Sequence, residues 1–185
     1  MSRVALLGGS FNPPHVAHQM AALWVLSTGR ADQVWLVPCF QHPFAKKLCA
    51  FEHRRRMCEL AVEGLWASGL IAVSSVEQEL GGTSRTLDTI EHLLGRHPGH
   101  ELALVIGADI LGETDSWYRF EEIERLVDLI VVGRGGYEGP EGTVVLPRVS
   151  STEIRARLRA GEPVDHLVPA RVLAYIEEQG LYRGA

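Results

Sequence analysis

Residues 4–18 of this 185-residue chain read Val-Ala-Leu-Leu-Gly-Gly-Ser-Phe-Asn-Pro-Pro-His-Val-Ala-His, and this stretch decides the fold. The apolar residues 4–7 predict a buried first strand, and the apolar residues 19–26 predict a helix after it. Glycines that follow a strand let the backbone approach a phosphate closely, and a helix N-terminus offers free N–H groups and positive potential. Because His15 and His18 stand at this junction, the stretch predicts a strand–turn–helix unit that binds phosphate.

Five further apolar runs predict strands, and helical patterns separate most of them. We expect the strands at residues 34–37, 71–73, 102–106, 129–132 and 144–146. We expect the other helices at residues 51–67, 86–94, 120–126, 152–159 and 169–178. The strands lack polar alternation, which is typical of strands covered on both faces. The sequence therefore predicts an α/β fold: a Rossmann-like doubly wound parallel sheet with helices on both faces and a short C-terminal helical segment.

Length and composition predict one domain over residues 1–185, with 46% hydrophobic and 22% charged residues. The net charge of −5 argues against a nucleic-acid partner. The three cysteines show no C-x-x-C spacing, so we expect reduced thiols rather than a disulfide framework or a four-cysteine zinc site. The chain shows neither a secretion signal nor a run of 18 apolar residues, so we expect a cytoplasmic protein with no membrane contact.

A second candidate anion site lies at residues 150–155, which read Ser-Ser-Thr-Glu-Ile-Arg and open a predicted helix. A hydroxyl residue at such a place is often only an N-cap. Here, however, Ser151 and Thr152 add donors at the same helix start, and Arg155 follows one turn later. These groups suit β- and γ-phosphates. Together with the histidine-rich turn, they indicate an enzyme that holds a polyphosphate from two sides, although capping or core roles for the histidines stay open.

Other positions have both a functional and a structural interpretation. Asp109, after the strand at 102–106, could cap a helix or lie near a ribose hydroxyl or a hydrated Mg²⁺. Trp117 and Tyr118 could pack in the core or stack on a flat ring. Lys46 or Lys47 could neutralise a substrate phosphate or remain solvated. Residues 54–56, three arginines, indicate a charged helix face from which only one or two side chains turn inward.

Three common motifs are absent from the sequence. It has no G-x-x-x-x-G-K-[ST] loop, no G-x-G-x-x-G after the first strand and no G-x-S-x-G. These absences argue against a P-loop kinase or ATPase, a dinucleotide oxidoreductase and a serine hydrolase of the nucleophile-elbow type.

The motifs together resemble those of the bacterial nicotinate mononucleotide adenylyltransferases. The similar elements are Gly8-Gly9-Ser10-Phe11-Asn12-Pro13-Pro14-His15-x-x-His18, Gly107-x-Asp109, Trp117, Ser150-Ser151-Thr152-x-x-Arg155, and the tail with Gly180-Leu181-Tyr182. This resemblance implies transfer of AMP from ATP to a pyridine mononucleotide, with release of pyrophosphate and no covalent enzyme intermediate. Rival interpretations are a phosphopantetheine adenylyltransferase, a cytidylyltransferase and a nucleotide-binding sensor without catalysis.

The resemblance also implies site residues, with Mg²⁺ accompanying ATP. The implied catalytic residues are His15, His18 and Arg155. The implied ATP-binding residues are Gly8, Gly9, Ser10, Phe11, His15, His18, Gly107, Asp109, Ser151, Thr152 and Arg155. The implied mononucleotide-binding residues are Ser10, Asn12, Lys46, Lys47, Ser84, Arg85, Thr86 and Trp117. Asp109 would reach the metal through water, and a homo-oligomer is left open.

Three positions depart from the family pattern. Ala17 replaces a glycine, residues 42–47 replace a Pro-Pro-His-Lys loop, and Arg85 replaces the tyrosine of a Ser-Tyr-Thr motif. Because Arg85 lies in the motif beside the pyridine pocket, we hypothesise that it recognises the nicotinate carboxylate. The preference between nicotinate and nicotinamide mononucleotide stays open.

Overall fold

The computed structural model describes residues 1–42, 47–65, 69–136, 140 and 143–183. Six strands form one parallel sheet in the order β3-β2-β1-β4-β5-β6. The strands are β1 (Ser2–Gly9), β2 (Gln33–Pro38), β3 (Ile71–Val73), β4 (His100–Gly107), β5 (Asp128–Arg134) and β6 (Val145–Leu146). The chain order reverses between β1 and β4, and ligands of doubly wound sheets bind at the carboxyl ends of the strands beside such a reversal.

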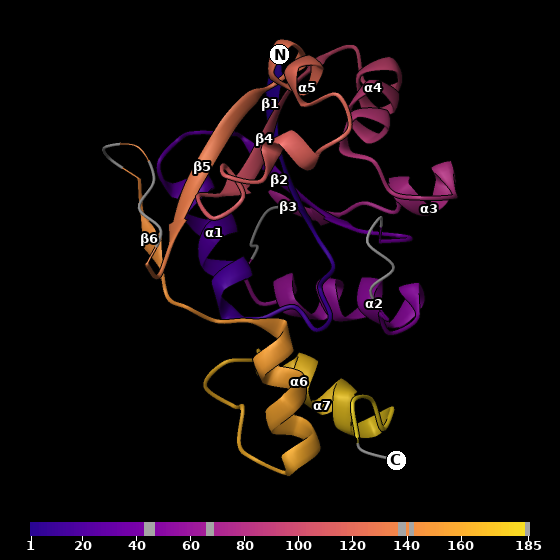
Figure 1. The fold of residues 1–185 in the computed structure, drawn as a ribbon, viewed down its shortest axis with the longest axis vertical. Helices are drawn as coiled ribbons and strands as arrows, with labels where there is room; N and C mark the ends of the chain where they lie inside the picture. The colour runs from indigo at the N-terminus through magenta and orange to yellow at the C-terminus, as the bar shows by residue number, and fades with distance from the viewer. Residues whose placement is uncertain (43–46, 66–68, 137–139, 141–142, 184–185) are drawn as a thin grey trace.

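Helices cover both faces of the sheet (Figure 1). Ala5 and Leu7 of β1 pack with residues of α1 (Val16–Ser27) and α2 (Phe51–Val62) on one face. Val4 and Leu6 pack with α4 (Thr86–Arg96) and α5 (Phe120–Leu126) on the other. Because alternate side chains of one strand enter two separate clusters, the doubly wound α/β prediction is confirmed.

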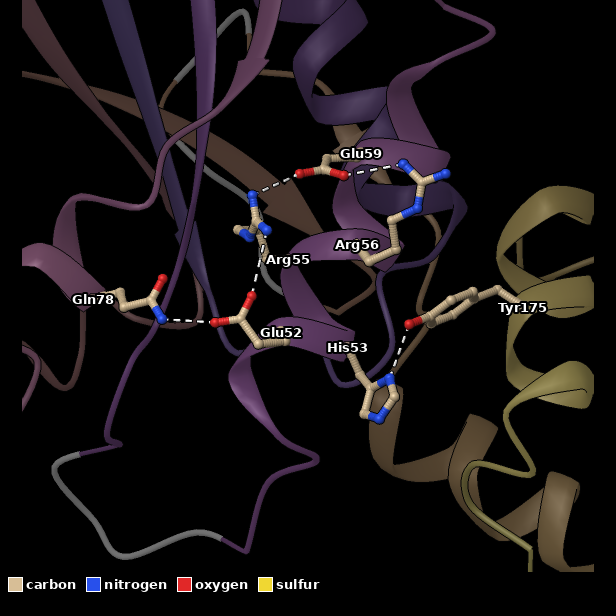
Figure 2. Close-up of polar contacts among 7 residues, drawn as sticks. All are labelled: Glu52, His53, Arg55, Arg56, Glu59, Gln78 and Tyr175. Carbon is tan, nitrogen blue, oxygen red and sulfur yellow. Dashed lines mark hydrogen bonds and ion pairs between the residues drawn. The ribbon is translucent and has the colours of Figure 1, made fainter.

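The last two helices, α6 (Ser151–Ala160) and α7 (Ala170–Glu178), lie beside α2 (Figure 1). Their cluster joins Met57 of α2 to Ile154 of α6 and Val172 of α7, all fully buried. Figure 2 shows a polar contact at its edge, where Nδ1 of His53 lies 2.9 Å from the Tyr175 hydroxyl. None of the described helices is both long and apolar enough to cross a membrane.

Some element boundaries differ from the sequence predictions. Helix α1 begins at Val16 rather than at residue 19, so His18 lies inside its first turn. Helix α2 ends at Val62 rather than at residue 67, because its next hydrogen bond, from Leu65 to Val62, already has the tighter three-residue spacing. The helix α3 (Val76–Leu80) and the 3₁₀ turn η1 (Thr114–Ser116) were not predicted, since such short elements show no periodicity.

Candidate active site

The turn between β1 and α1 packs tightly around Phe11. This residue has a positive φ of 45° and is 1% exposed. A Cβ atom on Gly9 would lie 3.3 Å from the Phe11 ring, so a glycine fits there best. The same ring lies 4.8 Å from the His18 ring, measured between centroids. Gly9 therefore lets the turn fold back over an aromatic residue that supports His18.

The two motif histidines lie together at the N-terminus of α1. The backbone N–H of His15 donates to Nδ1 of His18 over 3.1 Å, and the two rings stack with centroids 3.8 Å apart. Because a backbone N–H can only donate, Nδ1 of His18 accepts and the ring proton lies on Nε2. The helix start thus combines an imidazole N–H donor with a favourable dipole, an arrangement suited to a phosphate.

The start of α6 lies against the same turn. Ser151 Oγ donates to the carbonyl oxygen of Pro13 over 2.8 Å, and Arg155 Nη1 donates to that of Asn12 over 2.6 Å. Arg155 Nη2 also reaches the Thr152 hydroxyl at 3.3 Å. Ser150 is the N-cap, and its hydroxyl accepts from the Glu153 backbone N–H. The structure therefore brings the two predicted phosphate-binding helix starts together.

The side chain of Asn12 is buried by contacts that sequence patterns did not indicate. Its Oδ1 accepts from the Tyr182 hydroxyl over 2.7 Å and from the Cys49 backbone N–H over 3.2 Å. Asn12 is 2% exposed, and its described contacts hold it as part of the frame of the turn. The Gly180-Leu181-Tyr182 tail was the one sequence feature that pointed to this contact, but its sequence alone does not tell which residue the tyrosine contacts.

A cavity of about 480 Å³ lies at the carboxyl ends of β1, β2 and β4. The predicted residues that line it are Gly8, Gly9, Ser10, Ser84, Arg85, Thr86, Gly107 and Trp117. It is also lined by Tyr118, which the sequence grouped with Trp117, and by polar residues that were not predicted, namely His42, Glu77, Thr89, Glu113 and Ser116. The guanidinium carbon of Arg85 lies 4.3 Å from the Tyr118 ring centroid. The cavity therefore combines aromatic walls with a cation, which suits a flat anionic ring.

One of the three consecutive arginines points inward, as the sequence predicted. Figure 2 shows Arg55 and Arg56 in surface ion pairs with Glu59. Arg54 is instead 1% exposed, and burial lowers its pKa, although it remains far above neutral pH in a protein. Its guanidinium donates to the backbone carbonyl oxygens of Ser10, Cys39, Phe40 and Cys49. Arg54 therefore fixes the chain around the cavity rather than facing a ligand.

Gly107 and Asp109 form the last part of the site, at the end of β4. A Cβ atom on Gly107 would collide with Oδ1 of Asp109, so this carboxylate folds back over the glycine. Asp109 does not line the cavity. Within the described part of the chain, no three His, Cys, Asp or Glu side chains gather as a metal site. A single carboxylate fits a Mg²⁺ ion that arrives with substrate phosphates, because this ion keeps several waters and few protein ligands.

The predicted lysines are not part of the described site. Lys46 lies outside the described residues. Lys47 is exposed and does not line the cavity.

Comparisons with known proteins agree with this geometry. Residues 6–157 match the family model described as cytidylyltransferase-like. A protein of Anaeromyxobacter sp. (strain K), named "Probable nicotinate-nucleotide adenylyltransferase", is 53% identical over 184 residues, which cover 98% of this chain and 97% of that protein. A protein of Myxococcus xanthus (strain DK1622) with the same name is 48% identical over 182 residues, covering 97% and 94% of the two chains.

A solved structure shows that the fold is shared. It is the Plasmodium falciparum nicotinic acid mononucleotide adenylyltransferase complexed with NaAD, with a TM-score of 0.84 at 20% identity and 98% coverage of each chain. The relatives are similar to this chain over nearly its whole length, and the fold of the solved structure is the same parallel sheet. This chain belongs to the nicotinate-nucleotide adenylyltransferase family of cytidylyltransferase-like proteins.

Proposed function

We propose that this protein transfers the AMP moiety of ATP to nicotinate mononucleotide and releases pyrophosphate. The observation that carries the proposal is the position of the β1–α1 turn. Gly8, Gly9 and Ser10 line the cavity, and Asn12, two residues further on, accepts from Arg155. One turn thus borders both a ring-binding cavity and a phosphate-binding cluster. Joining two nucleotides requires both reactants to be held side by side.

The cavity is the site for the mononucleotide in this proposal. Trp117 provides a flat surface for the pyridine ring, and Arg85 provides a positive charge for the nicotinate carboxylate. Ser84 and Thr86 flank Arg85 at the start of α4, where both line the cavity, and the Thr86 hydroxyl adds a donor. Ser10 lines the same cavity, Asn12 lies two residues further along the turn, and Lys46 or Lys47 would neutralise the mononucleotide phosphate.

The cluster of helix starts is the site for the ATP phosphates. In the reaction, an oxygen of the mononucleotide phosphate forms a bond to the α-phosphorus of ATP while the bond to the pyrophosphate oxygen breaks. Negative charge then moves onto pyrophosphate. His18 donates from Nε2, and His15, Ser151, Thr152 and Arg155 surround the same region, where they stabilise that charge. Gly107 and Asp109 would lie beside the ribose and the metal.

The ATP-bound Mg²⁺ would be held by the substrate phosphates and, through water, by Asp109. When bound, the ion supplies positive charge that neutralises phosphate oxygens. We further propose that residues 1–185 act as one domain, because α6 carries Arg155 and shares a core cluster with α2.

The experiment that tests this function measures pyrophosphate release from Mg-ATP with three acceptors offered separately. These are nicotinate mononucleotide, nicotinamide mononucleotide and phosphopantetheine. We expect release with the pyridine mononucleotides, and with nicotinate mononucleotide most rapidly. Release only with phosphopantetheine, or ATP binding without any release, would refute the proposal in favour of a rival transferase or a sensor.

A further inference from the structure

The peptide groups just after β2 are held between two opposite charges. The N–H of Phe40 donates to Oε2 of Glu77 over 3.0 Å and to Oγ of Ser84 over 2.9 Å. The carbonyl oxygen of Phe40 accepts from Nη2 of Arg54 over 3.3 Å, and that of Cys39 from Nη1 over 2.6 Å. A carboxylate from α3 and a guanidinium from α2 thus fix the same short segment from both sides.

The carboxylate of Glu77 also reaches the segment that opens α4. Its side chain hydrogen-bonds the hydroxyl of Ser84, and Oε1 lies 3.4 Å from the Thr89 hydroxyl. Ser84 pairs in turn with Gln41, accepting from its N–H at Oγ and donating its own N–H to the Gln41 carbonyl over 2.9 Å. Glu77 therefore links the segment after β2 to the residues that precede Arg85.

The position of Glu77 shows which part of the site depends on it. It lines the cavity beside Ser84, Arg85 and Thr86. We call these three residues the acceptor wall, because the proposed function assigns them to the mononucleotide, which accepts the AMP moiety. The hydrogen bonds of Ser151 and Arg155 go to residues 12–13 and to Thr152, and none of them involves Glu77. Arg54 differs, because it also donates to the carbonyl oxygen of Ser10, on the turn shared by both halves of the site.

Burial makes this carboxylate unusual. Desolvation raises the pKa of Glu77, whereas its hydrogen bonds and the charge of Arg54 act in the opposite direction. A carboxylate with several donors and a nearby cation is well compensated, and its oxygens are already occupied by protein groups. It is therefore placed to order the wall and not to contact the substrate.

We propose that Glu77, balanced by Arg54, is a positioning residue that holds the acceptor wall of the cavity, so that its loss weakens binding of the pyridine mononucleotide and spares ATP. The inference rests on the proposed function. It extends that function to a residue of α3, outside the two helix starts that hold the phosphates. It assigns this residue to binding of the mononucleotide rather than of ATP.

The test measures KM for nicotinate mononucleotide, KM for ATP and kcat in Glu77→Ala, Glu77→Asp and Glu77→Gln. We expect the alanine and aspartate variants to raise the acceptor KM about tenfold, as for one lost buried hydrogen bond, with the ATP KM within about twofold. Aspartate keeps the charge but is one methylene too short to reach the Phe40 N–H. Glutamine should recover most of the acceptor affinity, because its oxygen can accept from Phe40 and its amide can donate to Thr89.

Glu79→Ala is the matched control. Glu79 lies two residues along the same helix, is half-exposed and pairs with Arg96 away from the cavity. This variant should leave both KM values and kcat unchanged. Arg54→Lys should instead alter both KM values, because Arg54 also holds Ser10.

Two results would overturn the inference and can be told apart. Wild-type protein that turns over neither pyridine mononucleotide overturns the proposed function, and this inference with it. If the wild type turns over, two results for the aspartate variant overturn the inference alone. One is an acceptor KM within about twofold of the wild-type value, and the other is an equal rise in both KM values. If the alanine variant does not fold, the aspartate and glutamine variants decide, and calorimetric titration of each nucleotide separately provides a readout independent of turnover.

Discussion

The hydroxyl of Tyr182 donates to Oδ1 of Asn12 over 2.7 Å, although 170 residues separate the two in the chain. Desolvation raises the pKa of Tyr182 far above neutral pH, so the group acts only as a neutral hydroxyl. Tyr182 has a positive φ of 61°, an uncommon conformation for a residue other than glycine. Surrounding structure must hold such a residue, so this contact ties the C-terminal segment to the motif turn.

Tyr182→Phe should therefore loosen the turn between β1 and α1. We expect a loss of about 1 kcal/mol in the free energy of unfolding, as for a buried hydrogen bond. We also expect a lower kcat, because Asn12 belongs to the turn that borders both halves of the site. Urea unfolding and steady-state kinetics measure the two effects. Tyr175→Phe, which loses only the contact with His53 shown in Figure 2, should leave kcat unchanged; equal kcat in both variants would contradict the prediction.

His18 offers a test of which ring nitrogen serves the reaction. His18→Ala should lower kcat by about two to four orders of magnitude, as for a lost transition-state donor. An asparagine carries an acceptor near Nδ1, whereas a glutamine amide extends a donor toward Nε2. Since Nδ1 already accepts from His15, we expect His18→Gln to retain more activity than His18→Asn. The reverse order, from turnover assays with folded variants, would show that the bond to His15 matters more than the donor.

Gly107→Ala should displace the Asp109 carboxylate, because the added Cβ would occupy the place of Oδ1. We expect a higher requirement for Mg²⁺ and a raised KM for ATP, with little change in the acceptor KM. Gly112→Ala is the control, since a Cβ at that exposed glycine meets open space. A titration of activity against Mg²⁺ measures the effect, and identical curves for both variants would remove Asp109 from the ATP side.

Arg85→Ala should reduce the preference for nicotinate over nicotinamide mononucleotide. The guanidinium lies over Tyr118 at 4.3 Å in the cavity wall, where a substrate carboxylate gains from a fixed charge. In the variant, the kcat/KM values for the two substrates should differ by about tenfold or less. The change from wild type should be on the order of the loss of one charged hydrogen bond. An unchanged ratio would assign the preference to other groups of the wall.

The raised pKa of Glu77 predicts how stability depends on pH. A folded-state pKa above the unfolded value means that the folded protein binds the proton more tightly. The stabilisation that this proton binding adds to the folded protein is complete below the ordinary glutamate pKa of about 4.3. It is lost as the pH rises through the pKa of Glu77 in the folded protein. The free energy of unfolding of Glu77→Gln, relative to wild type, should therefore increase from acid to neutral pH. Urea unfolding over a pH series measures it, and a constant or falling difference would contradict the sign.

The sequence determined the fold class and the main motifs. Continuous apolar runs between helical patterns predicted a doubly wound parallel sheet, because strands buried on both faces must be apolar throughout. Ligands of such sheets bind beyond the carboxyl ends of the strands. Ser84, Arg85, Thr86 and Trp117 indeed line one cavity with Gly8 and Gly9. Such predictions succeed because they depend on local periodicity and on the direction of the strands.

Only the tertiary structure decided which side chains hold the site together. Helical spacing allowed one or two of three arginines to turn inward, but only the packing of α2 against the turn selected Arg54. Glu77 was not predicted, because a five-residue helix has no periodicity and a glutamate is usually solvated. Tyr182 meets Asn12 only after the whole chain has folded. These roles come from contacts between distant segments, where burial turns an ordinary polar residue into a required hydrogen-bond partner.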